Sequence, residues 1–355
     1  MRGVSDIGSV DSGALQDSMN QSMRAFITGA AGFVGSGLAR MLIAEGHEVQ
    51  VLVRPGSDMW RLAPVLDRIT VHHGDIRDEV VLTDILRKSK PEALFHLAAY
   101  GAYPGTQQDP EKILDTNIRG ALAVFQAANH AGVGMVVAAG SSSEYGRKSE
   151  AMREDMRLNP STFYAVGKAA QTHLGQVLST SETPIITVRL FSVYGPFEEK
   201  GRLMPTLISR ALSGDDILLA NPISARDFIY LADVVAACLH VATRRDLGGE
   251  IVNLGSGIQS TLADACTAVI AATGSGSPVR THAFPSRSFD TDHWVADTAK
   301  LQEVIGFKTR YSLAEGIADM VNWFPSYAHV YTRTPQDGGY RCTDTTFGDG
   351  HVGTQ

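Results

Sequence analysis

The sequence predicts an α/β fold, in which a Rossmann-type, doubly wound parallel sheet is joined by a smaller C-terminal α/β lobe. Three observations lead to this prediction. Short apolar, β-branched runs alternate with helical patterns along the first half of the chain. A glycine-rich turn follows the first of these runs. Several runs are apolar at consecutive positions, as in parallel strands that helices cover on both faces.

Composition limits the class of protein. The 355 residues are 44% hydrophobic and 19% charged, which suits one large globular domain or two that share a core. The net charge is -7 and the charges are scattered, so we expect no nucleic-acid partner. No apolar run reaches the ~18 residues that a membrane span needs. The spacing of Cys238, Cys266 and Cys342 suits neither disulfides nor a metal site, which favours a reducing cytoplasm and no metal.

Composition and hydrophobic patterning also suggest where the parts begin and end. We expect an N-terminal tail over 1–22, a Rossmann domain over 23–190, a smaller lobe made mainly of 191–324, and a C-terminal tail over 325–355.

Each element of the prediction comes from a local pattern. Runs typical of buried parallel strands are Ala25–Thr28, Val49–Val53, Ile69–His72, Ala93–Leu97, Met135–Ala139 and Ile185–Leu190. In the smaller lobe, helical patterns occupy Leu203–Leu212, Ala232–Ala242, Leu262–Ala272 and Leu313–Trp323. The short strands that we expect there are Ile251–Leu254 and Val279–Phe284.

The turn after the first strand predicts a dinucleotide site. Its glycines stand at Gly29, Gly32 and Gly35, and an amphipathic helix follows. Gly29 permits the sharp turn, Gly32 lets a pyrophosphate approach the backbone, and Gly35 lets the helix pack close to the sheet. The phosphates would then lie at a helix N-terminus.

The end of the second strand bears on the choice of cofactor. NAD-binding folds commonly place an acid there for the ribose 2'-hydroxyl, but this chain has Arg54. A guanidinium can pair with a 2'-phosphate, which favours NADP over NAD. The alternative is that Arg54 is a solvated charge and Asp58 contacts the ribose. Asp75, after the third strand, is placed to accept a hydrogen bond from the adenine amino group.

Candidate catalytic residues lie further along the chain. Tyr164 and Lys168 are four residues apart in a helical segment that Pro160 opens, so they share a helix face. The lysine ammonium would favour the phenolate and bring the tyrosine pKa closer to neutrality. Ser141, Ser142 and Ser143 close the fifth strand, where an open α/β sheet gathers its ligands. They can equally be a polar loop.

Several motifs together resemble one family. They are Thr28-Gly-Ala-Ala-Gly-Phe-Val-Gly35, His96-Leu-Ala-Ala99, Asn117, the serines, Tyr164-x-x-x-Lys168, Arg189-Leu-Phe-Ser-Val-Tyr-Gly-Pro196 and Arg226-Asp-Phe-Ile-Tyr-Leu-Ala-Asp233. In this order they resemble the extended short-chain dehydrogenases, the nucleotide-sugar epimerase/dehydratase family, over about 23–324. The resemblance implies a homodimer built from 110–131 and 161–180 of each subunit.

The resemblance also implies a set of site residues. The cofactor, NADP or else NAD, would contact Ala31, Phe33, Val34, Ile76, Leu97, Ala98, Ala99 and Asn117, besides Gly29, Gly32, Gly35, Arg54, Asp75, Tyr164 and Lys168. The nucleotide sugar would contact Tyr100, Ser143, Glu144, Ser192, Arg202, Leu203, Arg226, Arg287 and Asp290. At Ser192 many members have Asn, which is a departure from the family pattern.

The catalytic hydroxyl is assigned by counting. Four residues before Tyr145 of the Tyr-Gly dipeptide stands Ser141, with Ser142 as the alternative. Dehydratases of the family carry an Asp-Glu pair directly after this hydroxyl residue, where this chain has Ser142 and Ser143. Because Glu144 comes one place later, 4,6-dehydration is disfavoured.

The resemblance favours an oxidoreductase that acts at sugar C4 through a 4-keto species, first of all a nucleotide-sugar 4-epimerase. An NADPH-dependent reductase of 4-keto or 4-keto-6-deoxy sugars is the alternative, because Arg54 favours NADP. A non-catalytic NADP-sensing protein is the rival from another class. The presence of Ser141, Tyr164 and Lys168 together argues against it, because a sensor has no chemical use for them.

Overall fold

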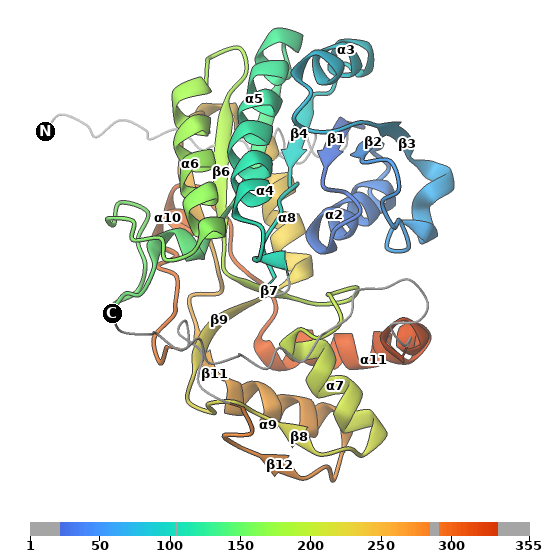
Figure 1. Ribbon diagram of the computed structural model, residues 1–355, viewed down its shortest axis with the longest axis vertical. Helices are drawn as coiled ribbons and strands as arrows, with labels where there is room; N and C mark the ends of the chain where they lie inside the picture. The colour runs from blue at the N-terminus through green and yellow to red at the C-terminus, as the bar shows by residue number, and fades with distance from the viewer. Residues whose placement is uncertain (1–21, 104–105, 285–290, 333–355) are drawn as a thin grey trace, which may run out of the picture.

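The computed structural model describes residues 22–103, 106–284 and 291–332. It consists of a large lobe built on a seven-stranded sheet and a smaller lobe below it (Figure 1). β7 (Ser192–Tyr194) and β9 (Ala225–Tyr230) lie where the two lobes meet (Figure 1). The predicted fold class is therefore confirmed.

The large sheet is parallel throughout, in the order β10-β6-β5-β4-β1-β2-β3. Its strands are β1 (Arg24–Thr28), β2 (Glu48–Val53), β3 (Thr70–His73), β4 (Ala93–His96), β5 (Met135–Ser141), β6 (Ile185–Leu190) and β10 (Ile251–Leu254). The order runs outward from β1 in both directions, so the carboxyl ends of β1 and β4 form a switch point where such sheets bind ligands.

Helices cover both faces of this sheet. One apolar cluster joins it to α2 (Phe33–Ala44), α8 (Leu231–Ala242) and α10 (Ala299–Glu303). A second cluster, on the other face, joins it to α3 (Glu79–Ser89), α5 (Gly120–Ala131) and α6 (Phe163–Leu178). This double cover explains the continuous apolar runs of the strands. The short elements are η1 (Ala63–Arg68), α4 (Pro110–Leu114), the π-helical turn η3 (Asp115–Arg119), η4 (Ser142–Tyr145) and η5 (Arg245–Leu247).

The smaller lobe has its own apolar core. Helices α7 (Leu203–Ser213), α9 (Leu262–Thr273) and α11 (Leu313–Thr332) contribute most of it. A three-stranded sheet combines β7, β9 and β11 (Gln259–Thr261), and β8 (Ile217–Leu218) pairs with β12 (Val279–Arg280). In the described residues, no helix is long and apolar enough to cross a membrane.

Several sequence-based expectations about elements are corrected. The helix expected in the smaller lobe over Ala232–Ala242 is α8, which packs on the large sheet. Ile251–Leu254 belongs to the large sheet rather than to the smaller lobe, because it pairs in parallel with β6 from Ile251↔Thr187 to Leu254↔Leu190. The strand expected over Val279–Phe284 ends at Arg280. Helix α6 begins at Phe163, after Thr162 caps it by accepting from the Ala165 N–H, and not at Pro160.

A further correction concerns the C-terminal helix. It was expected to end at Trp323, with a tail from 325, but α11 continues through Pro325 to Thr332. Aromatic packing accompanies the extension: Trp323 stacks on Tyr327 at 4.6 Å between ring centroids, and Phe324 on Tyr331 at 4.7 Å. This packing offsets the backbone hydrogen bond that a proline removes. The rest of the predicted tail, 333–355, and the predicted tail 1–21 lie outside the described residues.

Candidate active site

The glycine turn has the geometry that its spacing predicts. Gly29 has φ +78°, and a Cβ there would lie 2.5 Å from the Ala98 nitrogen on the neighbouring strand's loop. A Cβ on Gly35 would lie 2.3 Å from the Gly29 carbonyl oxygen. Both positions therefore exclude any larger residue, because the crowding atoms belong to the backbone.

The N-terminus of α2 is open to an anion. Gly32 is the N-cap residue, it is exposed, and no side chain caps the helix. The first turn, which begins with the buried Phe33 and the half-buried Val34, contains no acid. The unpaired first-turn N–H groups and the helix dipole therefore fit a phosphate, as the glycine motif predicts.

Charged side chains line the far end of this predicted cofactor site. Asp75 accepts from Arg77 Nε at 2.9 Å and from Arg77 Nη2 at 2.7 Å. This pairing holds the pKa of Asp75 below its usual range, and the charge of Arg54 acts in the same direction. Arg54 is exposed at the end of β2, whereas Asp58 accepts a local hydrogen bond from the Trp60 N–H. The sequence alone did not indicate the Asp75–Arg77 pair, although the two residues are only two positions apart.

The loop after β4 is fixed by hydrogen bonds from a buried side chain. Asn117, in the π-helical turn, is buried and donates from Nδ2 to the Tyr100 carbonyl at 2.8 Å. Its Oδ1 accepts from the Tyr100 N–H at 2.9 Å. Asn117 therefore fixes the path of the Leu97–Tyr100 backbone, a role that its prediction as a direct cofactor contact did not include. Ile76 is buried and would contact a Cβ on Gly120.

Helix α6 brings Tyr164 and Lys168 to the end of β5. Lys168 is 2% exposed, and its Nζ donates to the Ala139 carbonyl at 2.8 Å and to Gln171 Oε1 at 3.0 Å. Burial lowers its pKa to about 8, and the charge of Glu144 opposes this effect. Gln171 was missed by the sequence analysis, although it lies three residues after Lys168 on the same helix face.

The pKa of Tyr164 is not lowered as expected. Burial raises the pKa of Tyr164 well above its usual range, while a hydrogen bond with Ser141 and the charge of Arg202 act to lower it. The expectation that Lys168 would bring this pKa toward neutrality is wrong for this structure. The cause is that the lysine ammonium is directed at a backbone carbonyl and an amide.

The three serines have different surroundings. Ser141 Oγ lies 2.8 Å from Ser143 Oγ and also bonds to Tyr164. Ser142 is buried and accepts from Trp294 Nε1 at 3.2 Å. The hydroxyl of Ser141, rather than that of Ser142, therefore interacts with the tyrosine, and Ser143 contacts Ser141.

Glu144 is completely buried, so this structure does not support its prediction as a sugar contact. It is 0% exposed and forms an ion pair with Arg189, itself 1% exposed, at 2.8 Å. The buried arginine needs a charged partner, and Glu144 is that partner.

The remaining predicted sugar contacts lie at the junction of the lobes. Arg202 is the N-cap residue of α7, and its guanidinium lies 5.4 Å from the centre of the Tyr103 ring. Leu203 begins the same helix, Ser192 begins β7, and Arg226 on β9 donates to the Ala225 carbonyl at 2.6 Å. Arg287 and Asp290 lie outside the described residues.

One acidic residue beside this group was missed. Glu198 is 4% exposed, accepts from Arg202 Nε at 3.4 Å, and its Oε2 is buried without a partner among the described residues. Burial raises its pKa to about 7. The only signal in the sequence was its place four residues before Arg202.

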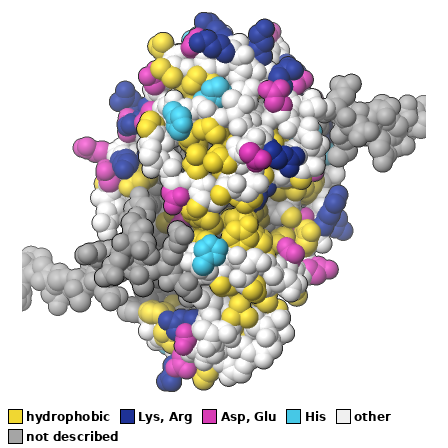
Figure 2. All heavy atoms as spheres, turned by 90° about the vertical axis from the view of Figure 1, so that its right-hand side faces the viewer, with side chains coloured by type: hydrophobic (Ala, Val, Ile, Leu, Met, Phe, Trp, Pro, Cys, Tyr) yellow, Lys and Arg dark blue, Asp and Glu magenta, His cyan; other side chains and the backbone are white. Residues whose placement is uncertain are grey.

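A surface view supports the two-lobed arrangement. On the face shown in Figure 2, hydrophobic side chains gather across the middle of the molecule, and charges of both signs are scattered over the rest.

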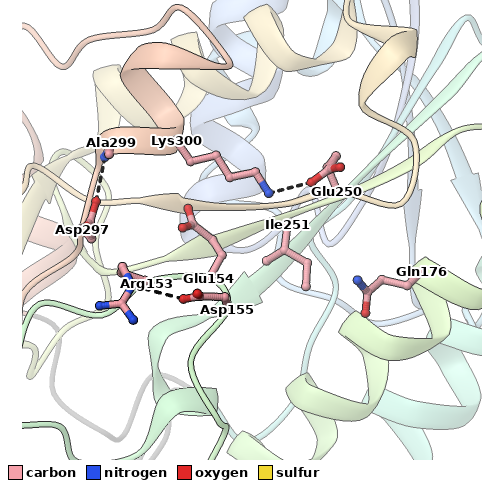
Figure 3. Close-up of a pocket in the computed structure, with 9 residues that line it drawn as sticks. All are labelled: Arg153, Glu154, Asp155, Gln176, Glu250, Ile251, Asp297, Ala299 and Lys300. Atoms are coloured by element: carbon pink, nitrogen blue, oxygen red, sulfur yellow. Dashed lines mark hydrogen bonds and ion pairs between the residues drawn. The ribbon is translucent and has the colours of Figure 1, made fainter.

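A separate pocket lies beside β10 (Figure 3) and is lined by Arg153, Glu154, Asp155, Gln176, Glu250, Ile251, Asp297, Ala299 and Lys300. None of the predicted site residues lines it, and Lys300 is paired there with Glu250 at 2.6 Å. Among the described residues, no cluster of His, Cys, Asp or Glu could hold a metal.

Known proteins resemble this chain over most of its length. A UDP-glucose 4-epimerase of Mycolicibacterium smegmatis is 31% identical over 312 residues, which cover 85% of this chain and 98% of the relative. The structure of DesIV, a dTDP-glucose 4,6-dehydratase of Streptomyces venezuelae with NAD and TYD bound, superposes with a TM-score of 0.78 at 28% identity, covering 87% of this chain and 99% of that chain. MoeE5 in complex with UDP-glucose and NAD superposes with a TM-score of 0.74 at 29% identity, covering 86% and 99%.

These comparisons give the family and leave the cofactor preference open. Both solved relatives contain NAD, so the preference for NADP that Arg54 predicts gains no support from them. The sequence model of the "NAD dependent epimerase/dehydratase family" matches residues 25–255, which include the glycine turn, the serines, Tyr164 and Lys168. The chain therefore belongs to the NAD-dependent epimerase/dehydratase family, whose members resemble the extended short-chain dehydrogenases.

Proposed function

We propose that this protein is an NAD(P)-dependent enzyme that acts at C4 of a nucleotide sugar through a 4-keto species, and that it is a 4-epimerase. The observation that carries the proposal is the grouping of Ser141, Tyr164 and Lys168 at the carboxyl end of β5, on the same edge of the sheet as the glycine turn after β1 and with β4 between them. The 31% identical UDP-glucose 4-epimerase supports the choice of reaction.

The residues can divide the chemistry among them. When bound, the oxidised nicotinamide supplies the hydride acceptor and a positive charge. Ser141 holds the sugar O4 by a hydrogen bond, and Tyr164 exchanges a proton with it. Lys168 uses two of its three N–H donors on Ala139 and Gln171, which leaves one for a hydroxyl of the ligands. Because burial raises the pKa of Tyr164, its action as a base depends on the groups that lower this pKa, which are the hydrogen bond with Ser141 and the positive charge of Arg202.

The competing reactions differ in specific residues. Dehydration would need acids at the positions of Ser142 and Ser143. The next acid, Glu144, is engaged in a buried ion pair with Arg189. Reduction of a 4-keto sugar would use the same hydroxyls but consume a reduced cofactor, and Arg54 is the feature that favours it. A non-catalytic sensor would leave the serine, tyrosine and lysine without a use.

Two incubations separate these reactions. Purified protein is mixed with UDP-glucose or dTDP-glucose and NAD or NADP in one, and with a nucleotide 4-keto sugar and NADPH in the other. Products are followed by proton NMR, and reduced nicotinamide by its absorbance. Inversion at C4 without net change of the cofactor identifies an epimerase. Stoichiometric loss of NADPH against a 4-keto sugar, with no inversion of saturated sugars, would replace it with a reductase.

The tyrosine gives the sharpest mutational test. Tyr164→Phe keeps the ring but removes the proton donor, so we expect turnover to fall by at least ~100-fold with cofactor binding unchanged. Steady-state kinetics and cofactor titration measure the two effects. Near-normal kcat in this variant would refute the proposed role.

We also propose that two copies pair through the helices of 110–131 and 161–180. Three hydrophobic side chains of α6 are exposed in the single chain: Phe163 at 51%, Val166 at 41% and Val177 at 80%. Burying them against a second copy would stabilise a dimer. Sedimentation of the wild type and of Val177→Glu tests this, and a monomeric wild type would exclude it.

A further inference from the structure

Glu144 connects three elements of the active site. Its Oε1 accepts from the Ser141 backbone N–H at 2.7 Å. Its Oε2 accepts from Thr172 Oγ1 at 2.9 Å and from Arg189 Nε at 2.8 Å. These donors belong to β5, α6 and β6, so one buried carboxylate holds the serine strand against the catalytic helix and the next strand.

The contact with α6 lies on the catalytic face of that helix. Thr172 follows Lys168 by one helical turn and Tyr164 by two, so the three side chains lie along one side. Losing the Thr172 contact would let α6 shift relative to the Ser141 backbone. Rates depend steeply on such displacements, because a misplacement of about 1 Å can lower turnover by ~100-fold.

Arg189 is in turn held by a second layer of contacts. Its Nη1 donates to the Tyr145 hydroxyl at 2.9 Å and to the Glu154 carbonyl at 3.3 Å. The Tyr145 hydroxyl donates to Asn253 Oδ1 at 2.6 Å. The network thus runs from Ser141 to β10 and Glu154, beside the pocket of Figure 3. Because every member has a partner, it can fix Glu144 in one position.

The charge of Glu144 also acts on the lysine. Burial lowers the pKa of Lys168, and the negative charge of Glu144 raises it. The other titratable groups near the lysine are His96, whose pKa burial lowers to about 3 so that it stays neutral, and the phenol of Tyr164. The charge of Glu144 therefore favours the protonated form of the buried ammonium, in addition to the hydrogen bonds that Glu144 accepts from Ser141 and Thr172.

We propose that Glu144 is a positioning residue of the active site, which fixes the Ser141 backbone against the face of helix α6 that carries Tyr164 and Lys168. The proposal deepens the proposed function and rests on it for the roles of Ser141, Tyr164 and Lys168. It assigns Glu144 to neither substrate nor cofactor.

The first test measures the titration of Lys168 in the absence of substrate. The titration of Lys168 is followed by NMR of the full-length protein with lysine labelled at 13Cε, with Lys168→Met identifying its signal. In Glu144→Gln the anion is lost, so we expect the titration midpoint to move to lower pH by about half to one pH unit. An unchanged midpoint would overturn the electrostatic role. Because no turnover is needed, this result is independent of the proposed reaction.

The second test separates positioning from stability. Thr172→Val deletes one donor to Glu144 and keeps the charge, so we expect kcat to fall by ~10-fold or more, with KM and the cofactor Kd within about two-fold and the lysine titration unchanged. Thr83→Val is the matched control, because it makes the same substitution on helix α3, where the hydroxyl donates to the Glu79 carbonyl at 2.8 Å. We expect its kcat to stay within about two-fold of the wild type.

The outcomes are decisive in each case. Wild-type kcat in Thr172→Val would overturn the positioning role, and so would an equal loss in Thr83→Val. Should Glu144→Gln fail to fold, the double variant Glu144→Gln/Arg189→Gln removes both buried charges and carries the same lysine measurement. A wild-type protein that turns over no nucleotide sugar would refute the proposed function, while the lysine titration would still decide the electrostatic part.

Discussion

Ser141 and Ser142 are adjacent, yet their side chains enter different environments. The first is half-buried beside Tyr164, and the second is buried beneath Trp294. The backbone of η4 causes this divergence, because Ser141 is its N-cap residue with an extended backbone and Ser142 is its first helical residue. Counting along the sequence could not tell which serine is catalytic, because the Ser142 hydroxyl bonds to Trp294, a residue 152 positions further along the chain.

This geometry predicts unequal effects of two alanine variants. Ser141→Ala removes the hydroxyl that bonds to Tyr164, so we expect turnover to fall by ~100-fold or more. Ser142→Ala removes a hydroxyl bonded only to Trp294 among the described residues, so we expect less than a ~10-fold effect. Kinetics of both variants at saturating substrate test this, and a larger loss in Ser142→Ala would reverse the assignment.

Arg54 carries the hypothesis of NADP preference. The guanidinium is exposed at the end of β2, and its charge reaches Asp75. If it pairs with a 2'-phosphate, Arg54→Ala should weaken NADP binding by roughly 1.5 to 3 kcal/mol and leave NAD binding nearly unchanged. Isothermal titration of both cofactors measures the ratio. A wild type that prefers NAD, as the NAD-containing relatives suggest for themselves, would end the hypothesis.

Helix α6 and the turn η3 each combine structural and functional positions. On one side of α6 lie Tyr164, Lys168 and Thr172, and on another lie the exposed Phe163 and Val177. The i, i+4 spacing predicted the first group from the sequence. The π-helical turn was not predicted from the sequence. Its Asn117 packs closely on Gly167 of α6, where an added Cβ would lie 3.0 Å from the Asn117 Cβ.

The packing of α2 against the glycine turn gives a prediction for this element. Gly35→Ala places a Cβ 2.3 Å from the Gly29 carbonyl oxygen, and neither backbone can retreat without moving the turn. We expect a loss of about 1 to 3 kcal/mol in the free energy of unfolding and at least ~10-fold weaker cofactor binding.

The control for this prediction is Gly276→Ala. A Cβ at Gly276 meets nothing within 4 Å, so its stability should stay within about 0.5 kcal/mol of the wild type. Chemical denaturation and cofactor titration provide both measurements. Normal cofactor affinity in Gly35→Ala would contradict the close packing that we assign to this glycine.

The two lobes of the molecule meet at Phe197. Arg40 from α2 lies 3.8 Å from the centre of its ring, and Arg61 Nε donates to its carbonyl at 2.9 Å. From the smaller lobe, Trp323 and Tyr327 lie 4.8 and 4.7 Å from the same ring. Phe197 has φ +69°, a strained conformation for a non-glycine residue, which these contacts from both lobes maintain.

The adjacent Glu198 makes the stability of the whole molecule depend on pH. Its pKa rises from 4.5 to about 7 on folding because the carboxyl is buried. Between these two values the folded chain holds a proton that the unfolded chain releases, so stability falls as pH rises through this window. Glu198→Gln should therefore be more stable than the wild type at pH 8, by on the order of 1 to 3 kcal/mol, and similar at pH 5.

Thermal and urea unfolding at both pH values measure this difference. Glu199→Gln is the matched control, because it removes the neighbouring carboxylate, whose side chain is 44% exposed and pairs with Arg61 at 2.8 Å. Glu199→Gln should show no gain of stability at pH 8. Equal stability of Glu198→Gln and the wild type at pH 8 would show that the carboxyl is not buried as described.

Local patterns in the sequence were enough to predict the fold class, six of the seven large-sheet strands in their sheet, the glycine turn and the Tyr164–Lys168 helix face. These features repeat at short intervals, with periods of two, three or four residues, so neighbouring residues reveal them. The tertiary structure alone decided that Ile251–Leu254 completes the large sheet, that α11 passes through Pro325, and that Glu144 turns inward to Arg189. The first and third depend on partners far away in the chain, and the second depends on aromatic packing around α11 that includes Phe197, so each is settled only when the strands pair and the two lobes pack together.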